Sequence, residues 1–460
     1  MNRAELQSLG LDGIIDVVFE LRKELDTAYR VISALRKENE ALRAQLGQPP
    51  KTPKNSSIPP SQERKPNKPD EPKPKKPRKG HRGAFRALSA SPDHVIEAKA
   101  QACPHCDHRL SDADQGQIHA YDHIELPPVR PVTTRIHLHR GVCPCCRKRF
   151  AAPAPEGMAP GSPFGPNVVA LILYLHVVHA ISFKRMVDML AGVFGLTISQ
   201  GAIANILASA RAPMHAAAED IAAQVRASKV IASDETSARV KGKNWWQWVL
   251  LSSTAVYHLI TDSRGAKVPV EFLQGAIPEV WVADRYGAQN GHAEQRQVCL
   301  AHLLRDTQYV IDQGDEGFAP AFKELLLRAI DVGRRREALK DTTLRQYFYE
   351  LDREVNRLLN LPSTSAAGDK FADAINRCYP DLFVFIRRRD VPSTNNVSER
   401  ALRPSVIFRK VTGGFRSEWG ARLYAAIVSV IATAQLAGKD ALQAIADVLN
   451  PSQKTDAASA

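Results

Sequence analysis

Apolar positions near the N-terminus follow a heptad pattern. Between residues 14 and 46 they recur at alternating steps of four and three, which is typical of helices that pair along one seam. The a positions are Val18, Leu25, Ile32, Asn39 and Leu46, and the d positions are Ile14, Leu21, Ala28, Leu35 and Leu42. A single Asn at an a position fixes the register of a two-stranded coiled coil. We predict a dimerisation zipper over residues 1–48; the alternative is an amphipathic helix lying on its own protein.

Short apolar runs separated by turn residues follow in residues 229–284. Residues 230–232 lead at once into Asp234 and Glu235, which we interpret as an acidic turn, and Gly242 marks the next turn. Strands are predicted at 245–251, 255–260 and 280–283, with a helix near 267–274. The last of these strands ends on Asp284. Three strands, a helix and another strand are the order of a ribonuclease-H-like sheet, in which acids on the first and fourth strands come together.

Acids at the ends of buried strands are costly unless they hold a cation. For Asp234 and Asp284 taken singly, a plain turn-forming role stays open. Phosphodiester chemistry with two metal ions needs carboxylates from separate elements, and we expect Mg²⁺, or Mn²⁺, here. The third acid must come from a later helix, and Glu399 fits because Thr394 or Asn395 can cap that helix. Glu294 and Glu418 are rivals without such a cap. A cluster of cations suited to DNA phosphates surrounds Glu399: Arg400, Arg403, Arg409, Lys410 and Arg416.

Seven cysteines include two CxxC pairs, which indicates metal binding more than disulfides. The pairs are Cys103 with Cys106 and Cys143 with Cys146, and four thiolates suit one structural Zn²⁺. The ligand set stays open because Cys145 is an additional thiol and His108 a possible substitute. Strands are expected at 121–126 and 133–139, between the pairs. The basic residues around the second pair suit contact with DNA or with protein: Arg140, Arg147, Lys148 and Arg149.

The remaining patterns are mostly helical. Residues 167–181 predict a buried helix, and 183–194 with 199–210 resemble a helix-turn-helix, although two such helices occur in many helical domains. Between Asp284 and Glu399, residues 320–338 and 343–359 predict a helical insertion at about 315–391. Cys299 and His302 lie one helical turn apart, either as half a metal site or, as we favour, in a packing role. Two helices at 421–449 are expected to cover the core, and a frayed tail follows residue 451.

The excess of basic residues in the composition indicates a polyanionic partner such as nucleic acid. The formal net charge is +13. Residues 51–86 contribute +9 of it, from twelve Lys or Arg and three acids, and they contain eight prolines. We expect an extended, disordered arm that neutralises phosphates, with a plain spacer as the alternative. No apolar signal region opens the chain, and the run 168–181 is too short to span a bilayer. We therefore expect a cytoplasmic, nucleoid-associated protein with no membrane partner.

Several blocks together resemble the large transposase of the insertion-sequence-66 family, a DDE transposase. They are the zipper, KNSSIPPS at 54–61, the CxxC module at 103–146, VIASDETSARV, WVADRYGAQN, VCLAHLLRD, and TNNVSERALRPSVIFRKVTGGFRSEWGARLYA. The resemblance implies an acidic triad of Asp234, Asp284 and Glu399. It also implies metal-dependent cleavage and joining of DNA, with water as the first nucleophile and the freed 3′-hydroxyl as the second. Element ends and target DNA are the implied partners, and accessory proteins of the same element are possible.

We thus predict an α/β protein with a ribonuclease-H-like catalytic domain, a helical insertion, a coiled coil, a basic linker and a zinc-ribbon-like module. The expected boundaries are 1–48 zipper, 49–100 linker, 101–152 zinc module, 160–225 helical region, 226–418 catalytic domain and 419–460 C-terminal helices with tail. Two other functions stay open: a catalytically inactive DNA-binding regulator, and a ribonuclease-H-like nuclease or resolvase that cuts without joining. A homodimer or higher assembly through the zipper favours the transposase, because two DNA ends must be brought together.

Overall fold

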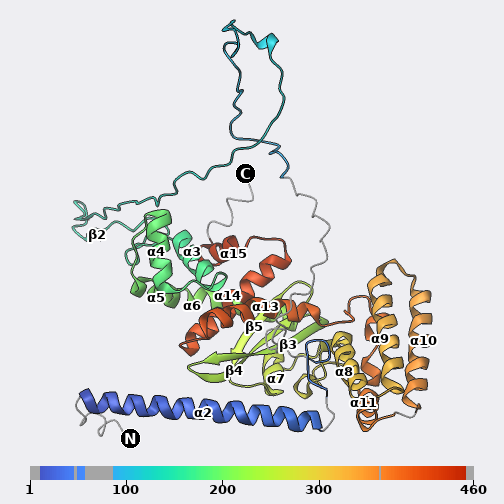
Figure 1. Ribbon diagram of the computed structural model, residues 1–460. Coiled ribbons are helices and arrows are strands. Elements are labelled where there is room, and N and C mark those ends of the chain that lie inside the picture. Colours follow the sequence, from blue (N-terminus) through green and yellow to red (C-terminus); the bar gives the residue numbers. More distant parts are fainter. Residues whose placement is uncertain (1–10, 46–48, 57–85, 362–363, 452–460) are drawn as a thin grey trace. The chain divides into compact units, whose positions relative to one another are not determined.

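A computed structural model describes residues 11–45, 49–56, 86–361 and 364–451 (Figure 1). Within the first helix it describes the side chains of residues 13 and 18–35. Contacts divide the chain into two units. One contains residues 1–63, 137–186 and 199–460, and the other contains 64–136 and 187–198. The first is a mixed α/β unit, as predicted.

The heptad stretch forms one helix, α2 (Leu11–Gln45), which confirms the predicted helix. Its described seam residues are exposed: Val18 is 58%, Leu25 54% and Ile32 44% accessible. Such a stripe is available to a partner helix, and the pairing itself stays a prediction. The side chains of Ile14, Asn39 and Leu42, and all of Leu46, lie outside the described residues.

The region of the CxxC pairs contains less regular structure than predicted. Residues 121–126 and 133–139 form no strands, and Tyr121, Leu126 and Val132 are 77%, 85% and 93% exposed. Alternation of apolar and polar residues makes a strand only when a partner strand and an apolar layer are present, so this prediction was wrong. A short hairpin instead flanks the second pair, with strands β1 (Arg140–Val142) and β2 (Arg149–Ala151). A 3₁₀ turn, η2 (Asp112–Asp114), follows the first pair.

Four helices precede the sheet: α3 (Pro166–Val177), α4 (Phe183–Phe194), α5 (Gln200–Ser209) and α6 (Arg211–Arg226). Ser199 caps α5 as expected, its Oγ accepting a hydrogen bond from the Ala202 amide at 3.1 Å. Helix α3 ends four residues earlier than the predicted Ile181, and Ala180 adopts a left-handed conformation with φ 53°. The helix-turn-helix interpretation stays a prediction.

A five-stranded sheet forms the centre of the first unit (Figure 1). Its strand order is β5-β4-β3-β6-β7. Its strands are β3 (Val230–Val240), β4 (Lys243–Leu251), β5 (Val256–Thr261), β6 (Val280–Ala283) and β7 (Gln295–Val298). The first three are antiparallel neighbours, whereas β3–β6 and β6–β7 are parallel. Helix α7 (Lys267–Leu273) connects β5 to β6, and the 3₁₀ turn η3 (Gly287–Gln289) precedes β7.

Two details of the sheet differ from the prediction. Asp234 and Glu235 do not form a turn, because β3 continues to Val240 and the chain reverses at Lys241 and Gly242, both with positive φ. Strand β7 was missed because its sequence is polar. Its Gln297 is buried and satisfied by donating to the carbonyls of Val298 and Leu382 at 2.7 and 3.0 Å, so burial there needs no apolar side chain.

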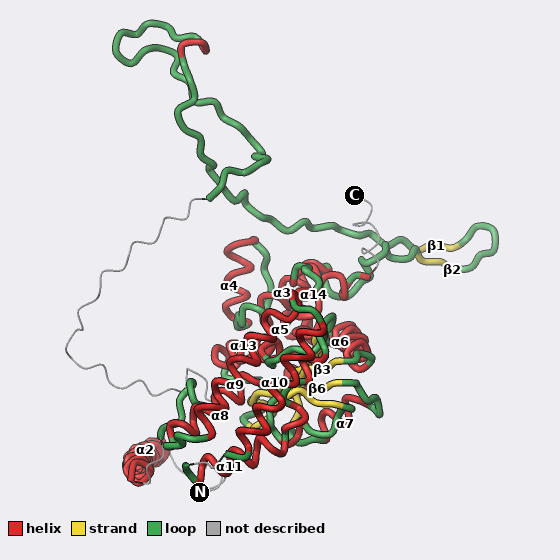
Figure 2. Tube along the Cα trace, turned by 90° about the vertical axis from the view of Figure 1, so that its right-hand side faces the viewer, coloured by secondary structure: helices red, strands yellow, loops and turns green. Residues whose placement is uncertain are grey.

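Helices occupy the segment predicted as an insertion at about 315–391, and the first of them begins earlier, at Leu300. The insertion contains α8 (Leu300–Asp312), α9 (Phe318–Arg335), α10 (Asp341–Leu359), α11 (Ala366–Arg377) and α12 (Val384–Arg387), with 3₁₀ turns η4 (Arg336–Ala338) and η5 (Tyr379–Asp381). Helix α9 packs against α8 and α10 (Figure 2). One apolar cluster joins Val282 and Val298 of the sheet to Phe318, Phe322 and Phe385. The insertion is therefore fixed to the sheet and can position groups beside it.

Three helices close the fold: α13 (Asn396–Thr412), α14 (Glu418–Leu436) and α15 (Ala441–Leu449). Helix α13 packs on β3 and β4, and α14 on β5 and α6. Gly414, with φ 109°, follows α13 where a Cβ would lie 2.6 Å from the Arg239 carbonyl, so only glycine lets this segment approach β3. Helix α14 is long and apolar enough to cross a membrane, but 56% of that apolar window is buried in the fold.

The first residues of the predicted extended linker are instead compact. Residues 50–56 form a turn, and the Asn55 side chain donates to Asp312 of α8 at 2.8 Å. The prediction of an extended arm from residue 51 was therefore wrong for residues 51–56, because local amide and hydroxyl hydrogen bonds outweigh the charge and proline content there. Residues 57–85 lie outside the described part of the chain, and residues 87–100 contain no helix or strand.

Candidate active site

Strand register brings the two predicted aspartates to neighbouring positions. Strand β3 pairs in parallel with β6, Ile231 opposite Trp281 and Ala232 opposite Val282. Continued by two residues, this register sets Asp234 opposite Asp284, which directly follows β6. Opposite residues of adjacent strands lie on the same face about 5 Å apart. The negative charge of Asp284 acts on Asp234, as expected if the two carboxyl groups lie near each other at this end of the sheet.

The electrostatics of Asp234 reflect this gathering of acids. Burial raises the pKa of Asp234 well above its ordinary value, and the negative charges of Glu235, Asp284 and Glu399 raise it further. A hydrogen bond from the Glu235 amide at 2.9 Å opposes the shift. A strongly perturbed carboxyl among like charges is typical of functional sites, and a bound cation would relieve the repulsion.

Glu235, next in sequence, has a different environment. Its carboxylate pairs with Arg264 at 2.9 Å and accepts from the Gln289 amide at 2.8 Å. Arg264 in turn lies over the rings of Trp246 and Tyr286, at 4.6 and 4.1 Å from their centroids. The Glu235 side chain is 2% exposed. Arg264 and Gln289 thus hold the two oxygens of the Glu235 carboxylate, while burial and the charge of Asp284 raise its pKa.

Glu399 reaches the same region from α13. It lies in the first turn of that helix and pairs with Arg305 of α8 at 3.0 Å. His302, one turn earlier on α8, has its Nε2 3.7 Å from the same carboxylate oxygen. Burial, followed by the charge of Arg305, lowers the pKa of His302, so Arg305 supplies the positive charge at Glu399. The rivals lie elsewhere: Glu418 pairs with Lys241, and Glu294 is exposed.

Asn395 anchors the start of α13 to the sheet. Its side-chain amide donates to the Ser233 carbonyl at 2.8 Å, one residue before Asp234. Its side-chain oxygen accepts from Ser398 at 2.6 Å, and its backbone amide donates to the Cys299 sulfur at 3.0 Å. Asn395 is fully buried. The Glu399 turn is thereby tied to β3, although the sequence suggested Asn395 only as a helix cap.

Cys299 and His302 both take part in this network, which supports the packing role over half a metal site. Cys299 is buried and holds the Asn395 amide, and burial raises the pKa of its thiol to about 11. A neutral thiol is a poor metal ligand. The Nδ1 of His302 is buried with no hydrogen-bond partner among the described residues.

The carboxylates of Asp234, Asp284 and Glu399 are of the type that binds a hard divalent cation, since Mg²⁺ prefers oxygen ligands. In the described part of the chain, however, no three His, Cys, Asp or Glu side chains lie close enough to hold one ion as they stand. At Glu399, one carboxylate oxygen is paired with Arg305 at 3.0 Å. A cation bound at that oxygen would compete with Arg305 for it.

The predicted DNA-contacting cations divide into two groups. Arg409 is half-buried, donates to the Ser237 hydroxyl at 3.0 Å, and has its pKa lowered by burial, so it is held against β3. Arg400, Arg403, Lys410 and Arg416 are exposed. Arg400 and Arg403 line a recess of about 350 Å³ between α13 and residues 178–180.

The two cysteine turns, which we call knuckles (residues 102–109 and 142–149), have the same local structure. In each, the backbone amide of the first cysteine donates to the carbonyl five residues further on. Cys103 N–H donates to the His108 carbonyl and Cys143 N–H to the Lys148 carbonyl, both at 2.9 Å. Asp107 and Arg147 share a left-handed φ of 56° and 57°. Backbone amides lower the pKa of Cys103 and of Cys143.

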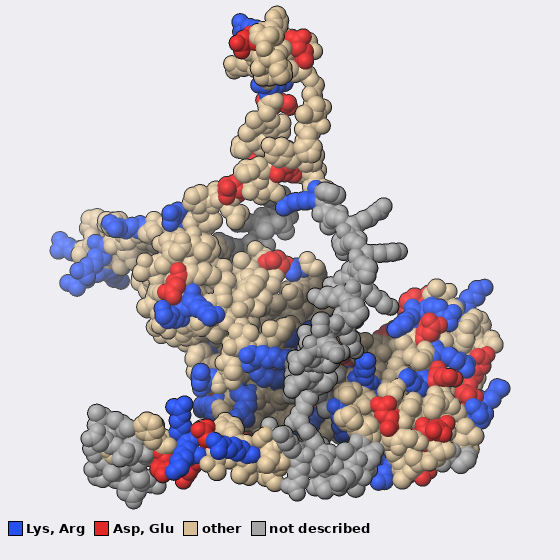
Figure 3. Space-filling view, viewed as in Figure 1, with Lys and Arg blue, Asp and Glu red and all other residues tan. Residues whose placement is uncertain are grey.

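This correspondence, a CPxCxxR repeat offset by 40 residues, was readable from the sequence and was missed. It aligns Cys145 with His105, outside the CxxC positions. It also aligns His108 with Lys148, which cannot replace a thiolate ligand. In Figure 3, Lys and Arg gather at the tip of hairpin β1–β2, around the second knuckle.

Comparisons with known proteins identify the family of the chain. A comparison with curated proteins gave no match. The family model described as "Transposase IS66 family" matches residues 161–423, a span that contains the whole sheet, the insertion and α13. All three acids lie inside it. Because this model covers more than half of the sequence, the chain belongs to the IS66 transposase family.

Proposed function

We propose that this protein is a DDE transposase that cuts the ends of an insertion sequence and joins them to target DNA. The observation that supports the proposal is the parallel register of β3 and β6, which directs Asp284 toward Asp234, together with the negative charges of Asp284 and Glu399 that raise the pKa of Asp234. The sheet order supports a ribonuclease-H-like fold, with acids on its first and fourth strands. Membership of the family supports a role in DNA transposition.

In the proposed reaction water attacks the phosphorus at the element's end, and the P–O3′ bond breaks to leave a 3′-hydroxyl. That hydroxyl then attacks a phosphodiester of the target, with release of a target 3′-oxygen. Two Mg²⁺ or Mn²⁺ ions, when bound, would activate the attacking oxygen and stabilise the leaving one. Asp234, Asp284 and Glu399 would hold these ions. Glu399 would leave its ion pair with Arg305 when it binds one of them. Arg400, Arg403, Lys410 and Arg416 would bind flanking phosphates, while Arg409 would stiffen the helix that presents them.

The N-terminal features complete the proposal. The exposed stripe of α2 would pair with that of a second copy and bring two element ends together. The two knuckles would share one structural Zn²⁺ through Cys103, Cys106, Cys143 and Cys146, without Cys145. Their matching local geometry supports this, since backbone amides lower the pKa of the first cysteine in each knuckle and zinc binds cysteine as the thiolate. The basic arm would add contacts with DNA that do not depend on sequence.

The test uses duplexes that carry the element's own terminal repeats, with Mg²⁺. Asp234→Asn, Asp284→Asn and Glu399→Gln should each abolish strand cleavage and strand transfer while the Kd for DNA changes little. Glu294→Gln, which removes an exposed acid, is the matched control and should retain activity. Cleavage by any of the three acid variants at the wild-type rate would refute the triad. Cleavage without transfer by the wild type would identify a nuclease instead.

A further inference from the structure

The KNSSIPPS block has no part in the chemistry above, yet its first residues are fixed in place. Asn55 is 4% exposed, and its side chain uses its full hydrogen-bonding capacity. The amide oxygen accepts from the backbone and hydroxyl of Thr52, at 2.6 and 3.2 Å. The amide nitrogen donates to the Pro50 carbonyl at 3.1 Å and to Asp312 at 2.8 Å. Residues 49–56, which we call the strap, are therefore a built element docked on α8.

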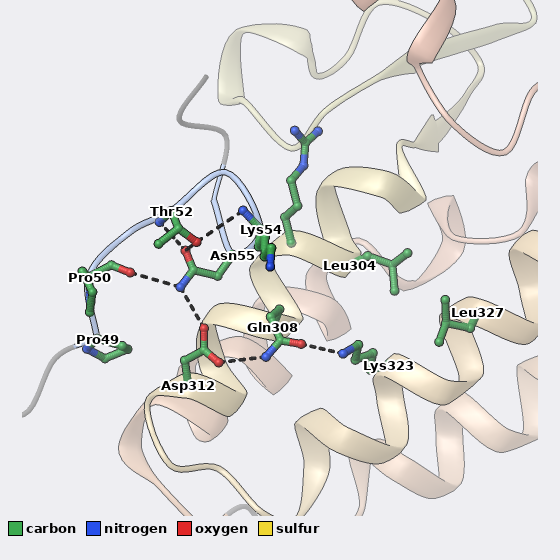
Figure 4. A pocket seen from close by; sticks show the side chains of 11 residues that line it. Pro49, Pro50, Thr52, Lys54, Asn55, Leu304, Gln308, Asp312, Lys323 and Leu327 are labelled. Atoms are coloured by element: carbon green, nitrogen blue, oxygen red, sulfur yellow. Dashed lines mark hydrogen bonds between the residues drawn. The ribbon is translucent and has the colours of Figure 1, made fainter. Parts of the chain in front are cut away.

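A chain of polar contacts continues from the strap across the insertion (Figure 4). The second oxygen of Asp312 accepts from Gln308 at 2.8 Å, and Gln308 accepts from Lys323 of α9 at 2.5 Å. The Asp312 carboxylate is thus already bound on both oxygens. Lys51 adds a cation–π contact, 5.5 Å from the centroid of the Tyr309 ring.

The strap, α8 and α9 border an open cavity of about 560 Å³. Its charged lining consists of Lys54 from the strap, Arg305 from α8, Lys323 from α9, and Asp312. Leu304 and Leu327 form an apolar part of the wall (Figure 4). Three cations and one carboxylate line the cavity, and the two oxygens of that carboxylate each accept one hydrogen bond, from Asn55 and Gln308. The cavity therefore has an excess of positive charge, and it suits an anion.

The position of Arg305 connects this cavity to the candidate active site. Its side chain lines the cavity and pairs with Glu399 at 3.0 Å. An anionic chain in the cavity would therefore lie one side chain away from the acid. Such a chain would also compete for Arg305, and would free Glu399 in the same event. A nucleic-acid strand carries one phosphate per nucleotide, so it can pair with several cations along the wall of such a site.

We propose that this cavity binds the phosphodiester backbone of a DNA strand next to the cleavage position, with Lys54 and Lys323 on its phosphates. The site is assembled only when the strap is docked, because Lys54 comes from the strap and Asn55 holds it there. The inference rests on the proposed function for the identity of the strand. It assigns the start of the KNSSIPPS block to substrate binding and separates it from the arm that follows.

The experiment measures the salt dependence of binding to a duplex with the element's terminal repeat, by fluorescence anisotropy. Lys54→Ala and Lys323→Ala should each lower the slope of log K against log salt by about 0.9, the value for one lost phosphate contact. Lys54→Arg should restore the slope. Lys370→Ala, an exposed lysine of α11, is the matched control and should leave the slope unchanged. Equal slopes for Lys54→Ala, Lys323→Ala and the control would overturn the proposal.

A double-variant test separates a docked Lys54 from one on a free arm. Asn55→Asp sets a carboxylate against Asp312 and should undock the strap, lowering the slope as Lys54→Ala does. The combination of both substitutions should then give no further loss. Independent, additive losses would mean that Lys54 contacts DNA without docking, and would refute the assembled site.

The cleavage assay distinguishes this failure from that of the proposed function. If the acid variants lose cleavage while the salt slopes of Lys54→Ala and Lys323→Ala match the control, the cavity does not bind DNA but the proposed transposase activity is supported. If Asp234→Asn cleaves like the wild type while Lys54→Ala lowers the slope, the triad fails and the cavity stands.

Discussion

Asn395 offers the sharpest test of how the third acid is positioned. Replacing it with Ala removes the donation to the Ser233 carbonyl and the acceptance from Ser398. Both partners are in a buried setting, since Ser233, Asn395 and Ser398 are each 0% exposed. Water therefore cannot easily replace the lost amide.

The structure sets the size of the effect. Each lost hydrogen bond costs about 1 kcal/mol net, and a buried partner left unsatisfied costs about 1–3 kcal/mol more. The Ser398 hydroxyl can rotate to another partner, whereas the Ser233 carbonyl stays unsatisfied. We therefore count one lost hydrogen bond and one unsatisfied group, and expect the free energy of unfolding to fall by about 2–4 kcal/mol. Loosening the tie beside Asp234 should also misplace Glu399. A displacement of about 1 Å at a reacting centre can cost about 10²-fold in rate, and we expect a loss of that order in cleavage.

Urea unfolding followed by tryptophan fluorescence is a suitable assay. All five tryptophans of the chain lie in β4, β6 and α14, so the signal reports on the sheet and its cover. The unfolding midpoint should fall by on the order of 1 M for Asn395→Ala. The adjacent Asn396 is exposed, and Asn396→Ala should change it little. Identical midpoints and identical cleavage rates for the two variants would refute the anchoring argument.

Three further predictions concern separate parts of the chain. Burial raises the pKa of the Asp234 carboxyl above its ordinary value of 3.8, so the folded state binds the carboxyl proton more tightly than the unfolded state, and stability falls as pH rises above 3.8. Asp234→Asn should therefore raise the Tm in chelator at neutral pH. Mg²⁺ should raise the Tm of the wild type more than that of the variant. Leu25→Asp should halve the mass measured by light scattering, whereas Arg22→Asp, outside the a and d positions, should not; an unchanged mass for both would dismiss the zipper. Cys146→Ser should lose bound zinc and Cys145→Ser should retain it, as measured by zinc content per chain, and equal losses would reject the CPxCxxR correspondence.

Local sequence was sufficient for most elements of the sheet and the insertion. The apolar runs that became β3 and β6, and the helical periodicity of α9 and α10, were found because their buried residues follow the strand or helix period. The predictions failed where partners mattered more than pattern. Strand β7 is polar and is held by the hydrogen bonds of Gln297, while residues 121–126 alternate like a strand but lack a partner. The strap was missed because Asn55 binds Asp312, 257 positions away.

The three acids were identified from residue types and from resemblance, but their roles depend on contacts that span long distances in the chain. Nothing local separates Asp234 from Glu235; the difference arises because Arg264 and Gln289 fold back onto Glu235 alone. In the same way the pairing of β3 with β6 sets Asp284 beside Asp234, and Asn395 and Arg305 determine where Glu399 lies. Periodicity encodes which residues are buried, because burial follows the repeat of the backbone. Which polar group meets which other is encoded by the packing of distant segments, and a linear pattern carries no record of it.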